Sequence, residues 1–503
     1  MIAIASKRQL FIDRRLIDHS ENVTLSVNRA AKIGALALGT EVSGGMVSVV
    51  AHGDTYYLYT RTEHRDGLAV HTSRDGLQWQ TPAPDAFGQG RALPLPGVNA
   101  GSVFIDPREK AYPFKGLFDI RQAGPWGLDP AFYGDTAPTQ ETRATARGGL
   151  FLFRSADGFR WELVPGLPVP FLCDTQNQVL FDPRIGRYVA YLRAFPTLGG
   201  AQHGRRCVAR VEVNDLYQMP WPHTPNPRNQ APAGHDYPYL HDELPIVMAA
   251  DAEDPATTDL YNPALTIYPW AQDAYLAFPS LFRRWDGIAC HGRDYRGKMN
   301  NSGLFETHLA VSGDGTTFCR YRQPYLSSGL VSDREGLKGD LDCGMIMWGV
   351  GMVRAGEVLY QYYFGTRRVH GATPEIVERG MKGSSVFAVR QRLDGFVSAD
   401  ADHRGGELLT KPFVFQGDRL LLNVECSGLG EVWVEIQDAE GRALAAQAMD
   451  QAVSIDRNGT GQEVWWRSGP QVSHLAGEPV RLRFRMRSAK LFAFEFAKGA
   501  EGK

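Results

Sequence analysis

Five polar side chains open successive apolar strand segments of this 503-residue chain, and four of the five are carboxylates. In order along the sequence they are Glu41, Asn99, Asp174, Asp259 and Asp342. Carboxylates crowded into one space repel each other, which raises the pKa of at least one and separates a proton donor from a base. Glycoside hydrolysis requires such a pair, because one acid protonates the leaving oxygen while the other acts as base or nucleophile.

Whether these residues meet depends on a hairpin that recurs along the chain. The frame Ser-x-Asp-Gly-x-x-aromatic occurs at Ser73–Trp79, Ser155–Trp161 and Ser312–Phe318, and a weaker copy spans Arg392–Phe396. Each copy follows an apolar alternating run, so Asp-Gly falls where a tight turn needs positive φ and the aromatic residue opens the return strand. We therefore assign the turn aspartates to folding rather than to chemistry.

The spacing of these turns predicts the architecture. Consecutive copies lie about 80 residues apart, except that the middle gap is about twice as long and should contain one degenerate unit. Its best candidate is the run 208–213 followed by Asn214-Asp215-Leu216. Five all-β units of about four strands each predict a five-bladed β-propeller over residues 1–402. The segment Gln9–Asp18 is expected to lend a strand to the last blade, since a closed ring leaves no open edge.

In a propeller the innermost strands run parallel around one axis, so residues at their openings converge on one mouth of the channel. We therefore expect the four carboxylates to line one pocket, with Glu306, at the start of a later strand, as a further catalytic candidate. A polar residue before a strand is also common punctuation, and that interpretation stays open for each of the five openings. The candidates for binding the substrate are Asn99, Gln176, Asn177, Tyr261, Trp348 and Arg121, the last in a long loop.

The pattern changes after about residue 403. Short strands then follow at regular spacing without the long period, which predicts a β-sandwich over residues 403–503. This part holds no cluster of acids, histidines and cysteines that suggests chemistry.

Composition narrows the function further. The net charge is −2 with 22% charged residues, and no basic run is long, so nucleic acid and anionic membranes are not expected partners. The first residues do not read as a signal peptide, and we expect a cytoplasmic protein. The six cysteines and thirteen histidines do not fall at metal-ligand spacing, so neither a metal nor another cofactor is expected. A small carbohydrate is the expected partner, and homo-oligomerisation stays open.

The five-unit layout, the acidic openings and the expected C-terminal β-sandwich resemble a known superfamily, the five-bladed propeller furanosidases that include invertases, levanases and arabinanases. Four segments are similar to a bacterial branch of it that is related to family 32 glycosidases. They are Leu10-Phe-Ile-Asp13-Arg-Arg-Leu-Ile, Cys173-Asp-Thr-Gln-Asn, Asp259-Leu-Tyr and Pro479-Val-Arg-Leu-Arg-Phe-Arg. It implies that Glu41 serves as nucleophile or base and Asp174 as the acid. Unit two opens with Asn99 and offers no clear counterpart of the supporting aspartate, and the Asn-Asp-Pro-Asn-Gly segment is missing.

The predicted function is therefore exo-hydrolysis of a small oligosaccharide, a fructoside or arabinofuranoside by resemblance. The alternative is a propeller that binds carbohydrate, or acts as a scaffold, without turnover.

Overall fold

The computed structural model describes residues 2–38, 42–62, 67–82, 92–95, 97–120, 149–169, 173–194, 206–222, 244–285, 302–332 and 338–498. This part of the chain is nearly all β, and its helices are single turns such as α2 (Pro374–Ile376) and the π-helical turn Val377–Met381 that follows it. None of the helices described is long and apolar enough to cross a membrane.

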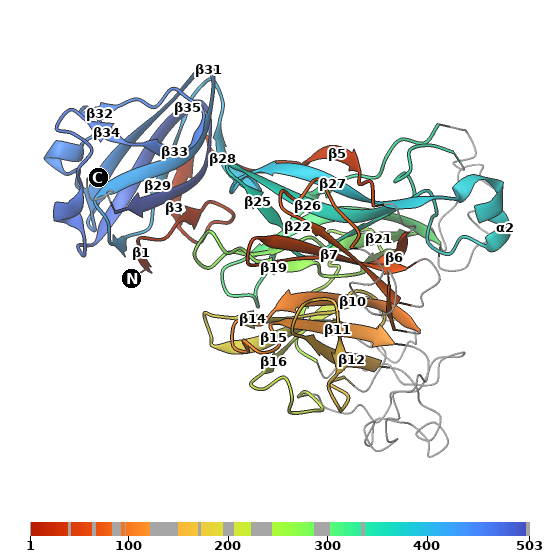
Figure 1. Ribbon diagram of the computed structural model, residues 1–503. Helices are drawn as coiled ribbons and strands as arrows, with labels where there is room; N and C mark the ends of the chain where they lie inside the picture. Colours follow the sequence, from red (N-terminus) through yellow and green to blue (C-terminus); the bar gives the residue numbers. More distant parts are fainter. Residues whose placement is uncertain are drawn as a thin grey trace.

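Five sheets form the blades of a propeller, which confirms the predicted fold (Figure 1). Blade one holds β6 (Val42–His52), β7 (Thr55–Thr62), β8 (Gly67–Ser73) and β9 (Ala92–Pro94). Blade two holds β10 (Val98–Ile105), β11 (Phe114–Ile120), β12 (Gly149–Ser155) and β13 (Glu162–Leu163). Blade three holds β14 (Gln178–Asp182), β15 (Arg187–Ala194), β16 (Cys207–Val213) and β17 (Ile246–Met248). Blade four holds β18 (Thr258–Leu260), β19 (Leu265–Ile267), β20 (Tyr275–Ala277), β21 (Ser280–Arg284), β22 (Gly303–Ser312) and β23 (Cys319–Leu326). Blade five holds β24 (Met345–Trp348), β25 (Val353–Ala355), β26 (Val358–Thr366), β27 (Ser384–Arg392) and the N-terminal strand β5 (Ala31–Ala35). The degenerate unit predicted in the middle gap is blade three, whose third strand is β16.

Hydrogen bonds near the axis join each blade to the next. They run from Val103 N to Ser48 Oγ (3.2 Å), from Ser102 Oγ to Asn177 O (2.8 Å), from Gln178 Nε2 to Leu265 O (2.8 Å), from Asn262 Nδ2 to Trp348 O (3.2 Å) and from Val49 N to Val350 O (2.9 Å). The last of these returns from blade five to blade one, so the ring is closed at its inner edge.

An N-terminal strand completes the last blade at its outer edge, as predicted. That strand is β5, however, and not the segment Gln9–Asp18, so the predicted segment was wrong. β5 pairs with β27 as the outer strand of blade five. The segment expected there instead supplies β2 (Gln9–Leu10) and β3 (Ile17–Glu21), which pair with C-terminal strands. The reason is hydrophobicity: Phe11 is fully buried and contacts Phe484 and Phe494, whereas β5 is mostly exposed, as an edge strand should be.

The three Asp-Gly turns are structurally equivalent. In the first copy Asp75 Oδ1 accepts the backbone N–H groups of residues 77 and 78 at 2.8 Å, while Gly76 has φ 78° and donates to Ser73 Oγ. The same bonds recur around Asp157 and Asp314. The weaker copy differs, because positive φ falls on Asp394 (61°) and its return strand leaves the propeller.

The second body is built on one ten-stranded sheet that combines both ends of the chain (Figure 1). Its strands are β1 (Ile2–Ala5), β2, β3, β4 (Thr24–Val27), β28 (Val397–Ala401), β29 (Gly406–Thr410), β30 (Phe413–Phe415), β31 (Arg419–Asp438), β33 (Gly459–Glu463) and β35 (Val480–Ala497), beside a two-stranded sheet of β32 (Ala452–Val453) and β34 (Trp465–Trp466). β31 and β35, with 20 and 18 residues, are much longer than the short strands predicted for this part of the chain. The sandwich arrangement itself stays a prediction, as do the domain boundaries, although residues 2–27 pair largely with this second body.

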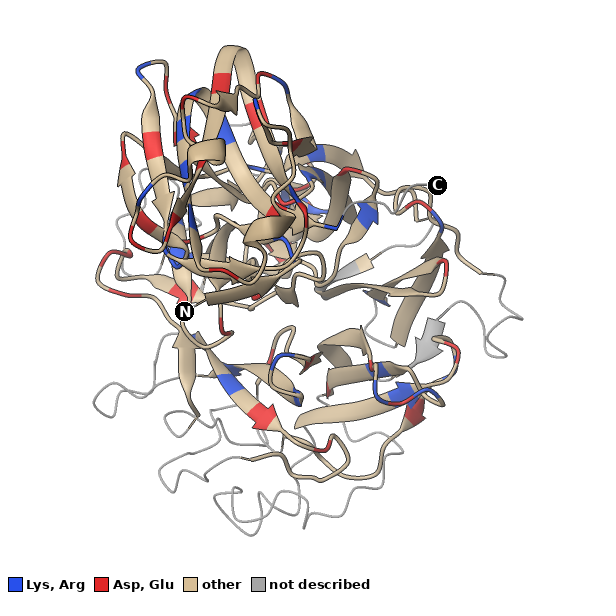
Figure 2. Cartoon of the chain, turned by 90° about the vertical axis from the view of Figure 1, so that its left-hand side faces the viewer, with Lys and Arg blue, Asp and Glu red and all other residues tan. Residues whose placement is uncertain are grey.

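Acidic and basic side chains are interspersed over this body, as Figure 2 shows. The arginines of β35 illustrate the reason, because Arg481 pairs with Asp18 (2.5 Å), Arg483 with Glu407 (2.7 Å) and Arg487 with Glu431 (3.3 Å). Exposed pairs of this kind add little stability, but they prevent a surface of one sign.

Candidate functional site

A cavity of about 900 Å³ is lined by residues of all five blades. Its size is that of a pocket for a ligand of a few sugar rings. The described residues on its wall are Val42, Arg61, Asn99, Ala100, Asp174, Thr175, Tyr261, Phe305, Met345, Met347, Phe364, Thr366, Arg368, His370, Gly371, Val377, Glu378, Met381, Lys382, Gly383 and Ser384.

Asp174 is the predicted catalytic carboxylate that the structure places on this wall. It precedes β14 and has φ 46°, and the next residue, Thr175, has φ 87°. Two consecutive non-glycine residues with positive φ are strained, and for a β-branched threonine this conformation is rare. The surrounding hydrogen bonds hold the turn, since Asn177 Nδ2 donates to Thr175 O at 3.1 Å. Strain of this kind concentrates at functional sites.

Two neighbours orient the Asp174 carboxylate. Arg193 Nη1 lies 2.5 Å from Oδ2, and Asn99 Nδ2 lies 3.0 Å from Oδ1. The Arg193 side chain is fully buried, so its guanidinium interacts with the carboxylate with little screening by water. Both oxygens of the carboxylate are therefore held by a fixed donor.

Asn99 also connects Asp174 to a second acid that the sequence analysis missed. Asp119, in β11, is completely buried, and its Oδ2 accepts Asn99 Nδ2 at 2.9 Å. Arg61 donates to the backbone and side-chain oxygens of Asn99, the latter at 3.3 Å. Blade two therefore contributes an acid–amide pair. The sequence does contain a signal for Asp119, because it is a single charged residue in the otherwise apolar strand segment Leu117-Phe-Asp-Ile.

Tyr261 forms the opposite side of the Asp174 site. Its ring lies 4.1 Å from the guanidinium carbon of Arg193, and its hydroxyl is 3.2 Å from His370 Nε2. Arg193 Nη2 also donates to the backbone carbonyl of Tyr261 at 2.8 Å. His370 packs against Phe282 and Phe305, so a continuous series of contacts leads from the carboxylate to an aromatic wall.

Part of the remaining wall is apolar, and part carries the charged side chains of Arg368, Glu378 and Lys382. Met345, Met347 and Phe364 from blade five and Met381 from the turn after α2 face the polar residues of blades one to three. The polar side suits hydroxyl groups, and the thioether and phenyl side suits the C–H face of a ring.

Asp259 and Asp342, which we expected beside Asp174, do not belong to the cavity wall. The side chain of Asp259 is almost fully buried, 2.7 Å from Arg206 Nη1 and 3.6 Å from Arg284 Nε. Asp342 pairs with Lys32 Nζ at 2.6 Å and accepts the Tyr363 hydroxyl at 2.7 Å. Both carboxylates are inside the ring, as the strand assignment requires, but each is neutralised by a base from a different segment.

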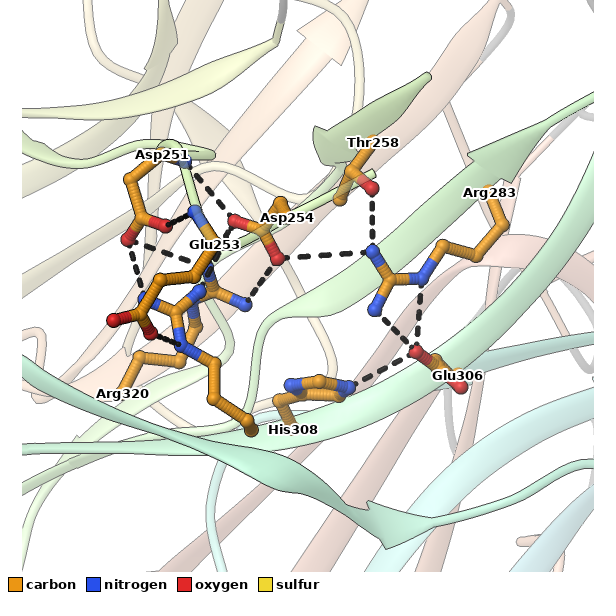
Figure 3. A network of polar contacts seen from close by, with 9 residues as sticks. Asp251, Glu253, Asp254, Thr258, Arg283, Glu306, His308 and Arg320 are labelled. Atoms are coloured by element: carbon orange, nitrogen blue, oxygen red, sulfur yellow. Dashed lines mark hydrogen bonds and ion pairs between the residues drawn. The ribbon is translucent and has the colours of Figure 1, made fainter. Parts of the chain in front are cut away.

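Glu306 belongs to a separate polar network in blade four, shown in Figure 3. Its Oε1 accepts Arg283 Nη2 at 2.7 Å and lies 3.0 Å from His308 Nε2. Arg283 continues the network to Asp254 at 3.7 Å (Figure 3). Burial raises the pKa of Glu306, but the hydrogen bond from His308 and the charge of Arg283 outweigh it, so the pKa lies below its usual value. This glutamate is therefore held as an anion and is poorly suited to donate a proton.

Three of the predicted sugar-binding residues are engaged inside the protein. Gln176 donates to Val47 O at 2.8 Å, and Asn177 bonds to the Arg193 backbone. Trp348 is fully buried and stacks on Phe278 and Tyr363. Asn99 and Tyr261 do line the cavity. Glu41 and Arg121 lie outside the described residues, although Glu41 directly precedes Val42 on the cavity wall.

In the part of the chain that the structure describes, no group of three or more histidine, cysteine or acidic side chains is arranged to hold a metal ion. Cys173, next to Asp174, is fully buried, and burial raises the pKa of its thiol, so it stays protonated and unreactive.

No protein-family model and no curated protein sequence matches this chain. Solved structures similar to it include a GH32 β-fructofuranosidase from Bombyx mori, with 8% identity, a TM-score of 0.39 and coverage of 94% of this chain and 96% of that one. A thermostable family-43 glycoside hydrolase matches with 12% identity, a TM-score of 0.38 and coverage of 75% and 96%. An N-acetylgalactosamine deacetylase from F. plautii, solved in complex with blood group B trisaccharide, matches with 10% identity, a TM-score of 0.40 and coverage of 74% and 96%.

Proposed function

We propose that this protein is a glycoside hydrolase that cleaves its substrate in the propeller cavity and depends on Asp174. The observation that carries the proposal is the Asp174 carboxylate itself. It lies on the wall of a ligand-sized cavity, on strained backbone, with Arg193 and Asn99 fixing both of its oxygens. Fixed charge at a cavity wall is the means by which enzymes stabilise charge that develops in a transition state.

The geometry favours a particular division of roles. Because Arg193 and Asn99 hold its two oxygens in place, Asp174 acts as the carboxylate that faces the positive charge of the sugar, as nucleophile, base or electrostatic stabiliser. The proton donor is then Glu41, which the sequence places immediately before the cavity residue Val42. This reverses the roles that the resemblance implies for the two residues.

The finer features of the substrate rest on the resemblance and on the position of the cavity. We propose a furanosidic sugar, a fructoside or arabinofuranoside, cleaved from the end of a small oligosaccharide. Entry at one mouth of a propeller channel supports action on a chain end, because an interior residue of a polymer would need a groove open at both sides.

A binding protein without turnover is the second candidate, and one observation favours it. Three of the expected catalytic acids, Asp259, Asp342 and Glu306, are held by basic side chains outside the cavity wall. On this alternative Asp174 and Arg193 would serve only as hydrogen-bonding groups for sugar hydroxyls.

A screen of nitrophenyl furanosides and pyranosides tests the proposal, followed by the variants Asp174→Asn and Glu41→Gln on the best substrate. Each variant should lower kcat by about a hundredfold or more, because an acid or base group contributes at least that much. If both variants retain nearly full kcat on a true substrate, the assignment is wrong. Sugar binding without hydrolysis of any glycoside would favour the second candidate.

A further inference from the structure

Trp465, in the second body, is the one described tryptophan that is exposed, with 47% of its surface accessible. It belongs to β34, which lies on the side of this body away from the propeller (Figure 1). The next residue, Trp466, is buried and donates from its Nε1 to Val434 O at 2.9 Å, which fixes the strand. Tryptophan is enriched at binding interfaces because it combines a large apolar face with a polar N–H group.

The orientation of the Trp465 ring is fixed as well. Its Nε1 donates to Glu463 Oε2 at 2.8 Å, and the other oxygen of Glu463 accepts Arg419 at 3.2 Å. No described aromatic ring or cation covers its faces. Trp433 in the same body is different, because the guanidinium carbon of Arg485 lies 4.7 Å from its ring centre. Among the described residues, an arginine covers the ring of Trp433, whereas no ring or cation covers the ring of Trp465.

A hollow of about 260 Å³ lies beside this ring. Asp456, Arg457 and Gln462 are on its wall together with Glu463, so the hollow offers carboxylate acceptors, guanidinium donors and an amide that does both. Asp456 and Arg457 are largely exposed and lie 3.5 Å apart. The site therefore combines one aromatic surface with polar groups of both kinds.

We propose that this hollow binds a sugar ring of a glycan, separately from the propeller cavity. A sugar ring has C–H groups on one face, which pack on the electron-rich face of an indole, and hydroxyl groups at its edge that need both donors and acceptors. The hollow is sized for about one ring. A protein partner fits poorly, since a stable interface covers about 800 Å² on each side, whereas the apolar surface here is limited to Trp465 and Val453.

The test is electrophoresis of the full-length protein through native gels containing arabinan, levan, inulin or arabinoxylan. Trp465→Ala is compared with the wild type and with the matched control Trp433→Ala, and the runs are repeated with excess monosaccharide to occupy the cavity. At least one polysaccharide should retard the wild type and Trp433→Ala. The apparent affinity of Trp465→Ala for it should be lower by about tenfold or more, as for the loss of an aromatic anchor.

Two results would overturn the proposal. One is that none of the four polysaccharides retards the wild type. The other is equal retardation of Trp465→Ala and the wild type, which would place the binding elsewhere. Retardation in the gel measures binding without turnover, so this test does not depend on whether the protein is a hydrolase. If it is one, Trp465→Ala should hydrolyse a small nitrophenyl glycoside as fast as the wild type.

Discussion

Arg193 is fully buried and pairs with Asp174 at 2.5 Å, so it determines how that carboxylate can react. The acidic residue was predictable, because it opens an apolar strand in a repeated unit. Its partner was not, because strand position does not reveal which of many arginines turns inward. Asp259, Asp342 and Glu306 illustrate the same limit: their positions satisfied the pattern, but Arg206, Lys32 and Arg283 neutralise them.

His71 gives a residue-scale prediction about pH. The ring is fully buried in β8, with Nδ1 2.9 Å from Thr81 Oγ1, and burial lowers its pKa to about 4. Below pH 6.5 the unfolded chain binds a proton that the folded chain excludes, so stability falls as the pH falls from about 6.5 towards 4. The free energy of unfolding should drop by about 2 kcal/mol between pH 7 and pH 5 from this group alone.

Urea unfolding of the wild type and His71→Gln at both pH values measures this contribution. The variant should be less stable overall but should lack this part of the pH dependence. An equal drop in both proteins would show that His71 is not the responsible group.

At the scale of elements, one tyrosine contact recurs between neighbouring blades. The hydroxyls of Tyr59, Tyr191 and Tyr362 donate to the turn carbonyls of Gly158, Gly315 and Gly76 at 2.9, 2.8 and 2.6 Å. In each case the second strand of one blade holds the Asp-Gly turn of the next. Burial raises the pKa of all three tyrosines, so the hydroxyls stay protonated and keep donating.

This contact explains why the sequence repeat was detectable. Two features of the turn require the glycine. Its φ is positive, and a Cβ on Gly76 would lie 2.7 Å from Tyr362 Oη, too close for the tyrosine contact to form. The third blade lacks the glycine, and its turn was found only from the spacing. The strand that closes the ring was missed because β5 carries no repeat motif and is mostly exposed.

The contact predicts a difference between two tyrosines of β26. Tyr362→Phe should lower the free energy of unfolding by about 1 kcal/mol or more, because a buried carbonyl loses its donor. Tyr360→Phe is the matched control, since the Tyr360 hydroxyl makes no hydrogen bond to the described residues and its loss should have little effect. Chemical denaturation of both variants provides the comparison, and equal effects would mean that the contact adds no stability.

At the scale of the whole molecule, the chain ends unite the two bodies. Arg8 reaches Asp394 in the last propeller turn at 2.8 Å and Glu495 in β35 at 3.0 Å. Asp394 is fully buried and also accepts the Tyr268 hydroxyl at 2.8 Å and Asn423 Nδ2 at 3.0 Å. The end of the sequence repeat predicts a second body, but pairing between the two ends of the chain leaves no local signal, so the position of residues 2–27 was not predictable.

We predict that Arg8→Ala lowers the free energy of unfolding by about 3 kcal/mol, because it leaves the buried Asp394 without its cation. The matched control is Arg404→Ala, which removes an exposed pair with Asp402 and should leave thermal unfolding unchanged. If Arg8→Ala unfolds at the same temperature as the wild type, the joint between the two bodies does not depend on this pair.

Cleavage of the sugar at Asp174 in the propeller cavity is tested most directly by a crystal structure of Asp174→Asn soaked with a glycoside that the wild type hydrolyses. We predict that the anomeric carbon lies within about 3.5 Å of the substituted side chain, the distance of a reactive complex, with Tyr261 beside the sugar. A sugar bound in the cavity but with its glycosidic bond far from residue 174, or bound only outside the cavity, would show that Asp174 does not carry the reaction.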